Sequence, residues 1–177
     1  FLRGWSYNYS NRCINALADF NNLITTNPQN EEAYFGRSYA KDNLGDKMGA
    51  RKDCEQTIKI NPNHSMALNN IGWSYFEAGD SRKALEYVNK SITADATNYI
   101  AFESRGEIKL KLNDLNGCIS DCSKAIELNP EQTNSYFIRG NAYFKMNKRQ
   151  LACLDWSKSG ELGKSEAYDL IRKYCNK

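Results

Sequence analysis

The residues most typical of zinc sites in this chain are its six cysteines and its single histidine, His64, and a cysteine thiol could also serve as a nucleophile. A zinc site needs four converging ligands, which usually come as closely spaced Cys or His pairs. Cys118 and Cys122 share one helix face and could supply half a site, but no second pair and no Cys-x-x-Cys accompanies them. We interpret the cysteines as small buried hydrophobic residues without disulfides. They are Cys13, Cys54, Cys118, Cys122, Cys153 and Cys175.

Catalytic signals are lacking in the rest of the sequence as well. There is no nucleophile motif, no glycine-rich phosphate loop and no metal ligand set, so the sequence predicts a non-catalytic protein without a cofactor. The composition, 41% hydrophobic and 25% charged, is typical of a globular chain, and no apolar run approaches the roughly 18 residues of a membrane span. Unpaired cysteines favour a reducing compartment, here the cytoplasm. The chain begins at Phe1 rather than Met, as a fragment or a processed product would.

Arginine and aspartate recur at one fixed separation along the chain. The functional interpretation is a row of arginines that awaits an acidic ligand. However, the pattern fails once, and there both members change together, to Ile71 and Tyr87. This joint change favours a structural ion pair between two helices. The four expected pairs are Arg3–Asp19, Arg37–Asp53, Arg105–Asp121 and Arg139–Asp155.

The elements that must position these residues follow from the three prolines. Pro62 follows Pro28 after a step of about 34 residues, and Pro130 follows after two further steps of the same length, with Ala96 at the missing step. A fixed period of this length indicates a stacked repeat protein. Within each unit the apolar spacing is helical in two stretches, which turn signals such as Gly45-Asp46 and Gly79-Asp80 separate. Each unit is therefore predicted to be a helix–turn–helix hairpin.

The recurring positions of the unit resemble the tetratricopeptide repeat family over the whole chain. Position 8 holds Gly72, Gly106 and Gly140, position 20 is mostly alanine, and proline stands at position 32. The resemblance implies an all-α fold, a right-handed superhelical α-solenoid of about five hairpins with a C-terminal capping helix. We expect a single domain, 1–177, with repeats 1–30 (truncated), 31–64, 65–98, 99–132 and 133–164 and a cap at 165–177. The general style is similar to bacterial multi-repeat proteins.

The resemblance also implies a binding surface, because the first helices of such repeats line a concave groove. Aromatic residues at groove positions would face solvent, where they are typical of interaction sites. The alternatives are that a missing N-terminal segment or a neighbouring molecule covers the first of them, or that the groove is ordinary solvated surface. The expected peptide-binding residues are Trp5, Tyr9, Phe35, Tyr39, Asn69, Asn70, Trp73, Phe76, Glu77, Glu103 and Glu107.

Charge divides between the two expected faces. Groove positions carry five acidic and two basic residues, whereas the outward positions of the second helices carry six basic and two acidic ones. An acidic, aromatic groove suits a peptide that has apolar anchors and some positive charge. The carboxylate clamp, by which relatives bind acidic chaperone tails, is not expected, because Phe35 and Tyr39 replace its first Lys and Asn.

These observations favour a protein–protein interaction scaffold with an unidentified protein or peptide partner. The alternative is a nucleic-acid-binding repeat protein that uses a lysine row on the second helices, Lys90, Lys124 and Lys158. The small net charge, +3, gives that alternative no support.

Overall fold

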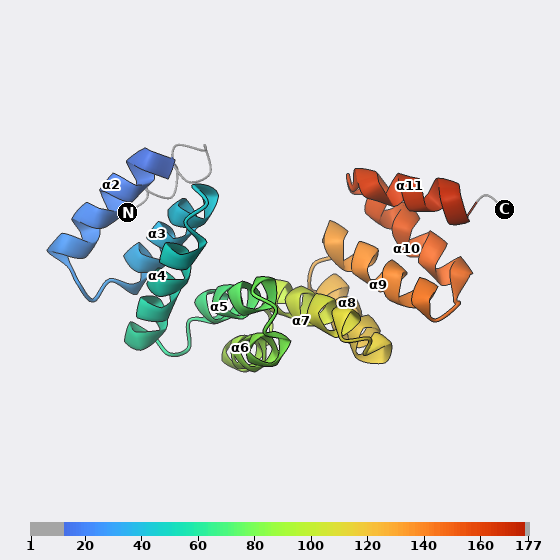
Figure 1. Ribbon diagram of the computed structural model, residues 1–177, viewed down its shortest axis with the longest axis horizontal. Coiled ribbons are helices and arrows are strands. Elements are labelled where there is room, and N and C mark those ends of the chain that lie inside the picture. The colour runs from blue at the N-terminus through green and yellow to red at the C-terminus, as the bar shows by residue number, and fades with distance from the viewer. Residues whose placement is uncertain (1–12, 176–177) are drawn as a thin grey trace.

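The structure is a computed structural model that describes residues 13–175, and this part of the chain is built of helices without strands. Figure 1 shows their order along a curved array. The helices are α2 (Cys13–Thr26), α3 (Glu31–Asn43), α4 (Lys47–Ile60), α5 (Ser65–Glu77), α6 (Ser81–Ala94), α7 (Tyr99–Lys111), α8 (Leu115–Leu128), α9 (Thr133–Lys145), α10 (Arg149–Glu161) and α11 (Ser165–Tyr174).

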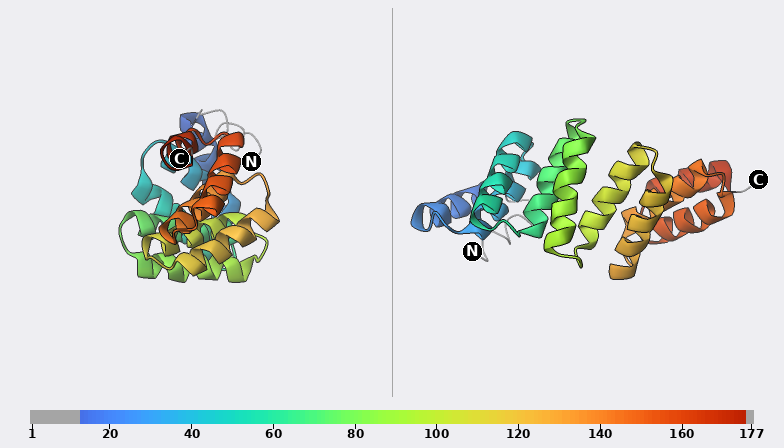
Figure 2. Two further views of the ribbon diagram at one scale, coloured as in Figure 1. Left: turned by 90° about the vertical axis from the view of Figure 1, so that its right-hand side faces the viewer. Right: turned by 90° about the horizontal axis from the view of Figure 1, so that it is seen from below.

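Successive helices form hairpins that stack side by side, as the right-hand view of Figure 2 shows. The hairpins are α3–α4, α5–α6, α7–α8 and α9–α10, with α2 packed on α3 and α11 packed on α10. In Figure 1 the two ends of the array, α2–α4 and α9–α11, rise on the same side of α5–α8. The fold is therefore an all-α solenoid of helical repeats, as predicted.

The turns inside the hairpins follow from local chemistry. Gly45 and Gly79 have φ of +83° and +86°, and Asn113 takes the same left-handed conformation with φ of 62°. The aspartate that follows each of these residues caps the next helix, since its side chain accepts a hydrogen bond from a backbone N–H of the first turn. The predicted Gly-Asp and Asn-Asp turn signals thus end one helix and begin the next.

Small residues hold the paired helices close together. A Cβ atom on Gly72 would lie 2.7 Å from a methyl group of Val88, and one on Gly140 would lie 2.7 Å from the ring of Trp156. The glycines at this repeat position are required for the close approach of the two helices. The core consists of one small apolar cluster at each junction of the stack rather than a single central core.

The last described helix, α11, packs against α10. Ala167 is fully buried, and Ile171 and Tyr174 pack on the cluster around Trp156. A disulfide joins Cys153 on α10 to Cys175 at the end of α11, so the prediction that these two cysteines are unpaired hydrophobic residues is wrong. Disulfides persist in oxidising compartments, and the argument from unpaired cysteines for a reducing compartment therefore no longer holds.

The other four cysteines are buried free thiols, in agreement with the sequence interpretation: Cys13, Cys54, Cys118 and Cys122. None of the helices in residues 13–175 has the length and apolar character that crossing a membrane requires.

Candidate functional site

A cleft of about 140 Å³ opens at the junction between α3, α4 and α5. Each of the three helices contributes residues from the side that faces its neighbours. The floor is formed by small side chains, and aromatic and charged side chains surround it. The lining residues are Ser38, Tyr39, Asp42, Lys47, Ala50, Arg51, Cys54, Asn70, Trp73, Ser74 and Glu77.

The next junction of the stack, where α5 and α6 meet α7, is filled by apolar side chains. The cleft exists because the corresponding positions at its own junction hold polar residues. Asp42, Arg51 and Ser74 line the cleft. At the corresponding positions one repeat later, the next junction has Phe76, Leu85 and Ile108. Those apolar residues pack in one cluster, in which Phe76 and Ile108 are buried. The first of these junctions is therefore open where the second is closed.

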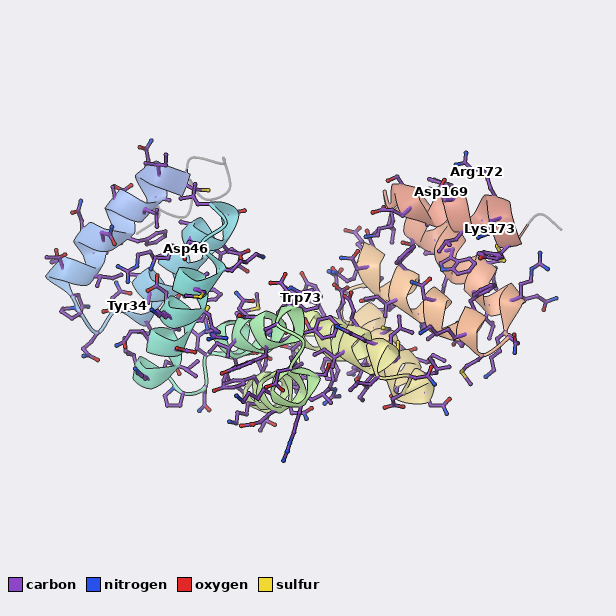
Figure 3. All side chains as sticks on the ribbon, viewed as in Figure 1. Tyr34, Asp46, Trp73, Asp169, Arg172 and Lys173 are labelled. Atoms are coloured by element: carbon purple, nitrogen blue, oxygen red, sulfur yellow. A yellow bond between two sulfur atoms is a disulfide. The ribbon has the colours of Figure 1, made fainter. Side chains whose placement is uncertain are left out.

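Two half-buried aromatic residues stand on opposite helices of the cleft. The Trp73 ring packs 5.2 Å from that of Phe76, and its indole Nε1 donates a hydrogen bond of 3.3 Å to Glu77 Oε1. Tyr39 meets Phe35 edge to face, with ring centroids 5.2 Å apart. In Figure 3 Trp73 lies on the upper side of α5, the side toward which both ends of the array rise.

A cation lies at the mouth of the cleft between two carboxylates. Lys47 Nζ is 3.1 Å from Asp42 Oδ1 and 3.4 Å from Glu77 Oε1. The hydrogen bond to Asp42 raises the pKa of Lys47 above its ordinary value. Lys47 thus bridges two repeats, since Asp42 belongs to α3 and Glu77 to α5.

The floor of the cleft contains a thiol that is unsuited to nucleophilic chemistry. Cys54 is 3% exposed, and burial raises the pKa of its thiol to about 11. Because the thiolate is the nucleophile, a thiol that stays protonated near neutral pH is inert. Among residues 13–175, no group of three or more His, Cys, Asp or Glu residues is arranged to hold a metal ion.

Four of the expected groove residues come together in this cleft: Tyr39, Asn70, Trp73 and Glu77. Three others were expected on the same open surface but lie in the core, which corrects that expectation. Phe35 is 6%, Phe76 9% and Asn69 3% exposed. Phe35 packs between Tyr39 and His64, and Phe76 packs against the following repeat, because stacking of the next first helix covers these positions. Trp5 and Tyr9 lie outside the described residues.

The acidic residues Glu103 and Glu107 lie on α7, apart from the cleft. Glu103 Oε2 accepts a hydrogen bond of 2.7 Å from the Ser135 hydroxyl on α9. Partial burial raises the pKa of Glu107, the nearby Glu103 raises it further, and Lys164 acts in the opposite direction. These carboxylates extend the first-helix surface but do not line the cleft.

The arginine–aspartate pairs within the described residues are bidentate. Arg37 donates through Nε and Nη2 to Asp53 at 2.8 and 2.7 Å. The same geometry joins Arg105 to Asp121 and Arg139 to Asp155. For the expected pair Arg3–Asp19, Arg3 lies outside the described residues.

Each arginine also has a second partner that the sequence interpretation missed. The remaining guanidinium nitrogen donates to a residue 16 positions upstream, on the helix that precedes the arginine's own helix. Each of these partners lies 16 residues before its arginine, just as the aspartate lies 16 residues after it, so the same spacing could have identified the partners in the sequence. They are Asn21, Asn89 and Ser123.

Lysines add a further contact at two of the pairs. Lys41 Nζ lies 2.7 Å from Asp53, and Lys109 Nζ lies 2.8 Å from Asp121. Both lysines stand one helical turn after the arginine, at a repeat position where the other two described hairpins have Tyr75 and Tyr143.

The hairpin α5–α6, which lacks the Arg and Asp residues, has an aromatic contact in place of the ion pair. Ile71 is fully buried, and Tyr75 stacks on Tyr87 with ring centroids 5.5 Å apart and an interplanar angle of 18°. The guanidinium of Arg51 lies 5.0 Å from the Tyr75 ring centroid. Apolar and cation–π contacts thus occupy the place of the charged network.

The comparisons with known proteins agree with this architecture. A family model described as tetratricopeptide repeat matches residues 31–64 and 101–132, and another of the same description matches residues 54–86. No similar sequence is found among curated proteins.

Several solved structures have the same fold, and in three of them the alignment with this chain covers most of the solved chain. MamA is 16% identical with a TM-score of 0.73, covering 93% of this chain and 96% of that one. YrrB, described as a TPR protein with an unusual peptide-binding site, is 15% identical with a TM-score of 0.70 (96% and 88% covered). The first TPR domain of Spaghetti, bound to an HSP90 peptide, is 29% identical with a TM-score of 0.61 (63% and 90%). The repeat models and the shared architecture show that the chain belongs to the tetratricopeptide repeat family.

Proposed function

We propose that this protein is a non-catalytic interaction scaffold that binds a peptide segment of a partner protein along its first helices, with the cleft between α3 and α5 as the main anchoring site. The observation that carries the proposal is the open junction itself, with Tyr39 and Trp73 half-buried on either side of it. Tryptophan and tyrosine dominate the binding energy of protein interfaces, especially in pockets that exclude water. Asn70 and Glu77 supply polar groups beside these aromatic residues.

Two structural neighbours support a peptide as the class of ligand. YrrB is described as having an unusual peptide-binding site, and the Spaghetti domain was solved with an HSP90 peptide. The remaining expected groove residues, Trp5, Tyr9, Glu103 and Glu107, would extend the contact toward both ends of the array.

We do not expect this protein to bind an acidic chaperone tail through a carboxylate clamp. Phe35 and Tyr39 stand at the first clamp positions, and Ile100 and Ser104 stand where a later lysine and arginine would be needed. These side chains offer an anionic peptide no positive charge, and Phe35 is moreover buried.

The alternative of nucleic-acid binding gains no support from the lysine row on the second helices. Lys90 lies 2.7 Å from Glu86, Lys124 lies 2.8 Å from Glu127, and Lys158 lies 3.4 Å from Glu161. Each lysine of the row has a carboxylate beside it on its own helix, and this negative charge disfavours the approach of a phosphate backbone.

A random-peptide phage library tests the proposed function. Wild-type protein should select a set of related peptides, and the double variant Tyr39→Ala/Trp73→Ala should lose them, because both aromatic walls are truncated. Tyr168→Ala is the matched control, since it removes an exposed tyrosine from α11, away from the cleft. A cooperative thermal melt of each variant shows that the fold is kept. Selection of the same peptides by the double variant would contradict the proposal.

A further inference from the structure

The charges at the mouth of the cleft differ from those at the next junction of the array. At the next junction Lys111 Nζ lies 4.7 Å from the centroid of the Phe76 ring, so a lysine of the array itself covers an aromatic face. The residues at the corresponding positions in the cleft, one repeat earlier, are Asp42 and Glu77. The cleft thus has two carboxylates where the next junction has the ring of Phe76 and the ammonium of Lys111.

The structure already shows how the cleft holds a cation. The ammonium of Lys47, a residue of the first turn of α4, lies between the two carboxylates. All three side chains are exposed, Lys47 by 55%, Asp42 by 51% and Glu77 by 43%. Exposed ion pairs of this kind contribute little to stability, so another cation can take the place of Lys47 at small cost.

From this arrangement we propose that the cleft takes a lysine or arginine side chain of the partner peptide, which replaces Lys47 between Asp42 and Glu77. The inference rests on the proposed peptide-binding function and specifies its anchor. The aliphatic stem would lie over Ala50 and Cys54, and the charged head would lie at the carboxylates, beside the rings of Tyr39 and Trp73. Aromatic faces and carboxylates together are a favourable surrounding for a cation.

The other cation that lines the cleft does not oppose this assignment. Arg51 lies 3.4 Å from Glu55, and its guanidinium lies over the Tyr75 ring. Its charge is therefore compensated by groups that do not line the cleft. Once Lys47 has moved away, the two carboxylates at the mouth have no other cation at ion-pair distance among the described residues.

The test uses peptides selected from the random-peptide library on the wild-type protein. The selected sequences should share a lysine or arginine, and replacing that residue with citrulline or norleucine should weaken binding by about two- to fivefold, the size expected for a partly exposed ion pair. Asp42→Asn and Glu77→Gln should weaken binding similarly. Lys47→Ala should tighten it, because the competing ammonium is gone. Lys52→Ala is the control, an exposed lysine on the same helix that does not line the cleft.

The possible failures separate the inference from the function on which it rests. Peptides that bind through the cleft equally well with citrulline or norleucine, and whose affinity does not change in Lys47→Ala, would overturn the cationic anchor and leave the scaffold function intact. A wild-type protein that selects no peptide at all would overturn both.

Discussion

At the scale of single residues, Arg37, Arg105 and Arg139 each connect three helices. Each one donates two hydrogen bonds to the aspartate of its own hairpin and a third to the helix that precedes its own. The separation along the chain is the same in both directions. A side chain that was predicted to pair two helices therefore also joins successive repeats, and its removal should affect the stacking.

The three described pairs are not equivalent, and this leads to a stability prediction. Asp121 keeps Lys109 when Arg105 is removed, whereas Asp155 has Tyr143 at the position that corresponds to Lys109. We expect Arg139→Met to lower the free energy of unfolding by about 3 kcal/mol, because it leaves a buried carboxylate without its cation. Arg105→Met should cost clearly less. Urea denaturation of both variants measures the difference.

The hairpin α5–α6 supplies the control for this prediction. Arg105→Ile combined with Asp121→Tyr copies the residues found at Ile71 and Tyr87, and it should recover most of the stability that Arg105→Ile alone loses. Equal losses for Arg105→Met and Arg139→Met, together with no recovery in the double variant, would contradict the structural role of the pairs.

At the scale of elements, α11 differs from the other helices because a covalent bond holds it. The helix buries only Ala167 completely, and the Cys153–Cys175 disulfide fastens its C-terminal end to α10. The aromatic rings of Phe144, Trp156 and Tyr174 meet beneath it, with the Phe144 and Tyr174 centroids 4.5 Å apart. The disulfide therefore keeps the cap over the last aromatic cluster of the array.

Reduction of this disulfide should loosen α11 without unfolding the array. For cysteines separated by 22 residues the loss of loop constraint amounts to about 3 kcal/mol, which corresponds to roughly hundredfold faster exchange of the α11 amides. Hydrogen exchange with and without dithiothreitol measures the effect, and amides of α5–α8 should not change. The Cys153→Ser/Cys175→Ser variant should exchange rapidly whether or not the reductant is present. Slow exchange of α11 in that variant would show that packing alone holds the cap.

The elements themselves could largely be predicted from the sequence, because their signals are local. Prolines and Gly-Asp turns mark where helices end and begin, and the structure has helix boundaries at Asp46, Asp80 and Asp114. The disulfide could not be predicted, since Cys153 and Cys175 carry no spacing signal and meet only through the docking of α11.

At the scale of the whole molecule, burial at the edge of the groove depends on how consecutive repeats stack. Phe35 and Phe76 occupy repeat positions that face the groove in the family pattern, but the next first helix covers them. Helix periodicity gives the direction of a side chain on its own helix and not the position of the neighbouring helix. This is why Tyr39, Asn70, Trp73 and Glu77 could be predicted as surface residues, whereas the burial of Phe35, Asn69 and Phe76 could not.

The cleft could be predicted only in part for the same reason. Tyr39, Asn70, Trp73 and Glu77 followed from the repeat positions, but Lys47, Arg51 and Cys54 come from α4, a second helix of the repeat. The difference between Asp42, Arg51 and Ser74 and the apolar residues one repeat later, Phe76, Leu85 and Ile108, is visible in the sequence once the repeats are aligned. The consequence, an open junction, becomes evident only when the three helices are placed together.

Binding of a peptide in the cleft is tested most directly by the indole N–H resonance of Trp73 during titration with a library-selected peptide. Trp73 lines the cleft, whereas Trp156 is 1% exposed and donates to Asn141, so it serves as the internal control. We expect the Trp73 signal, assigned with Trp73→Phe, to shift to saturation while the Trp156 signal stays in place. A peptide that binds and leaves the Trp73 signal unmoved would contradict binding in the cleft.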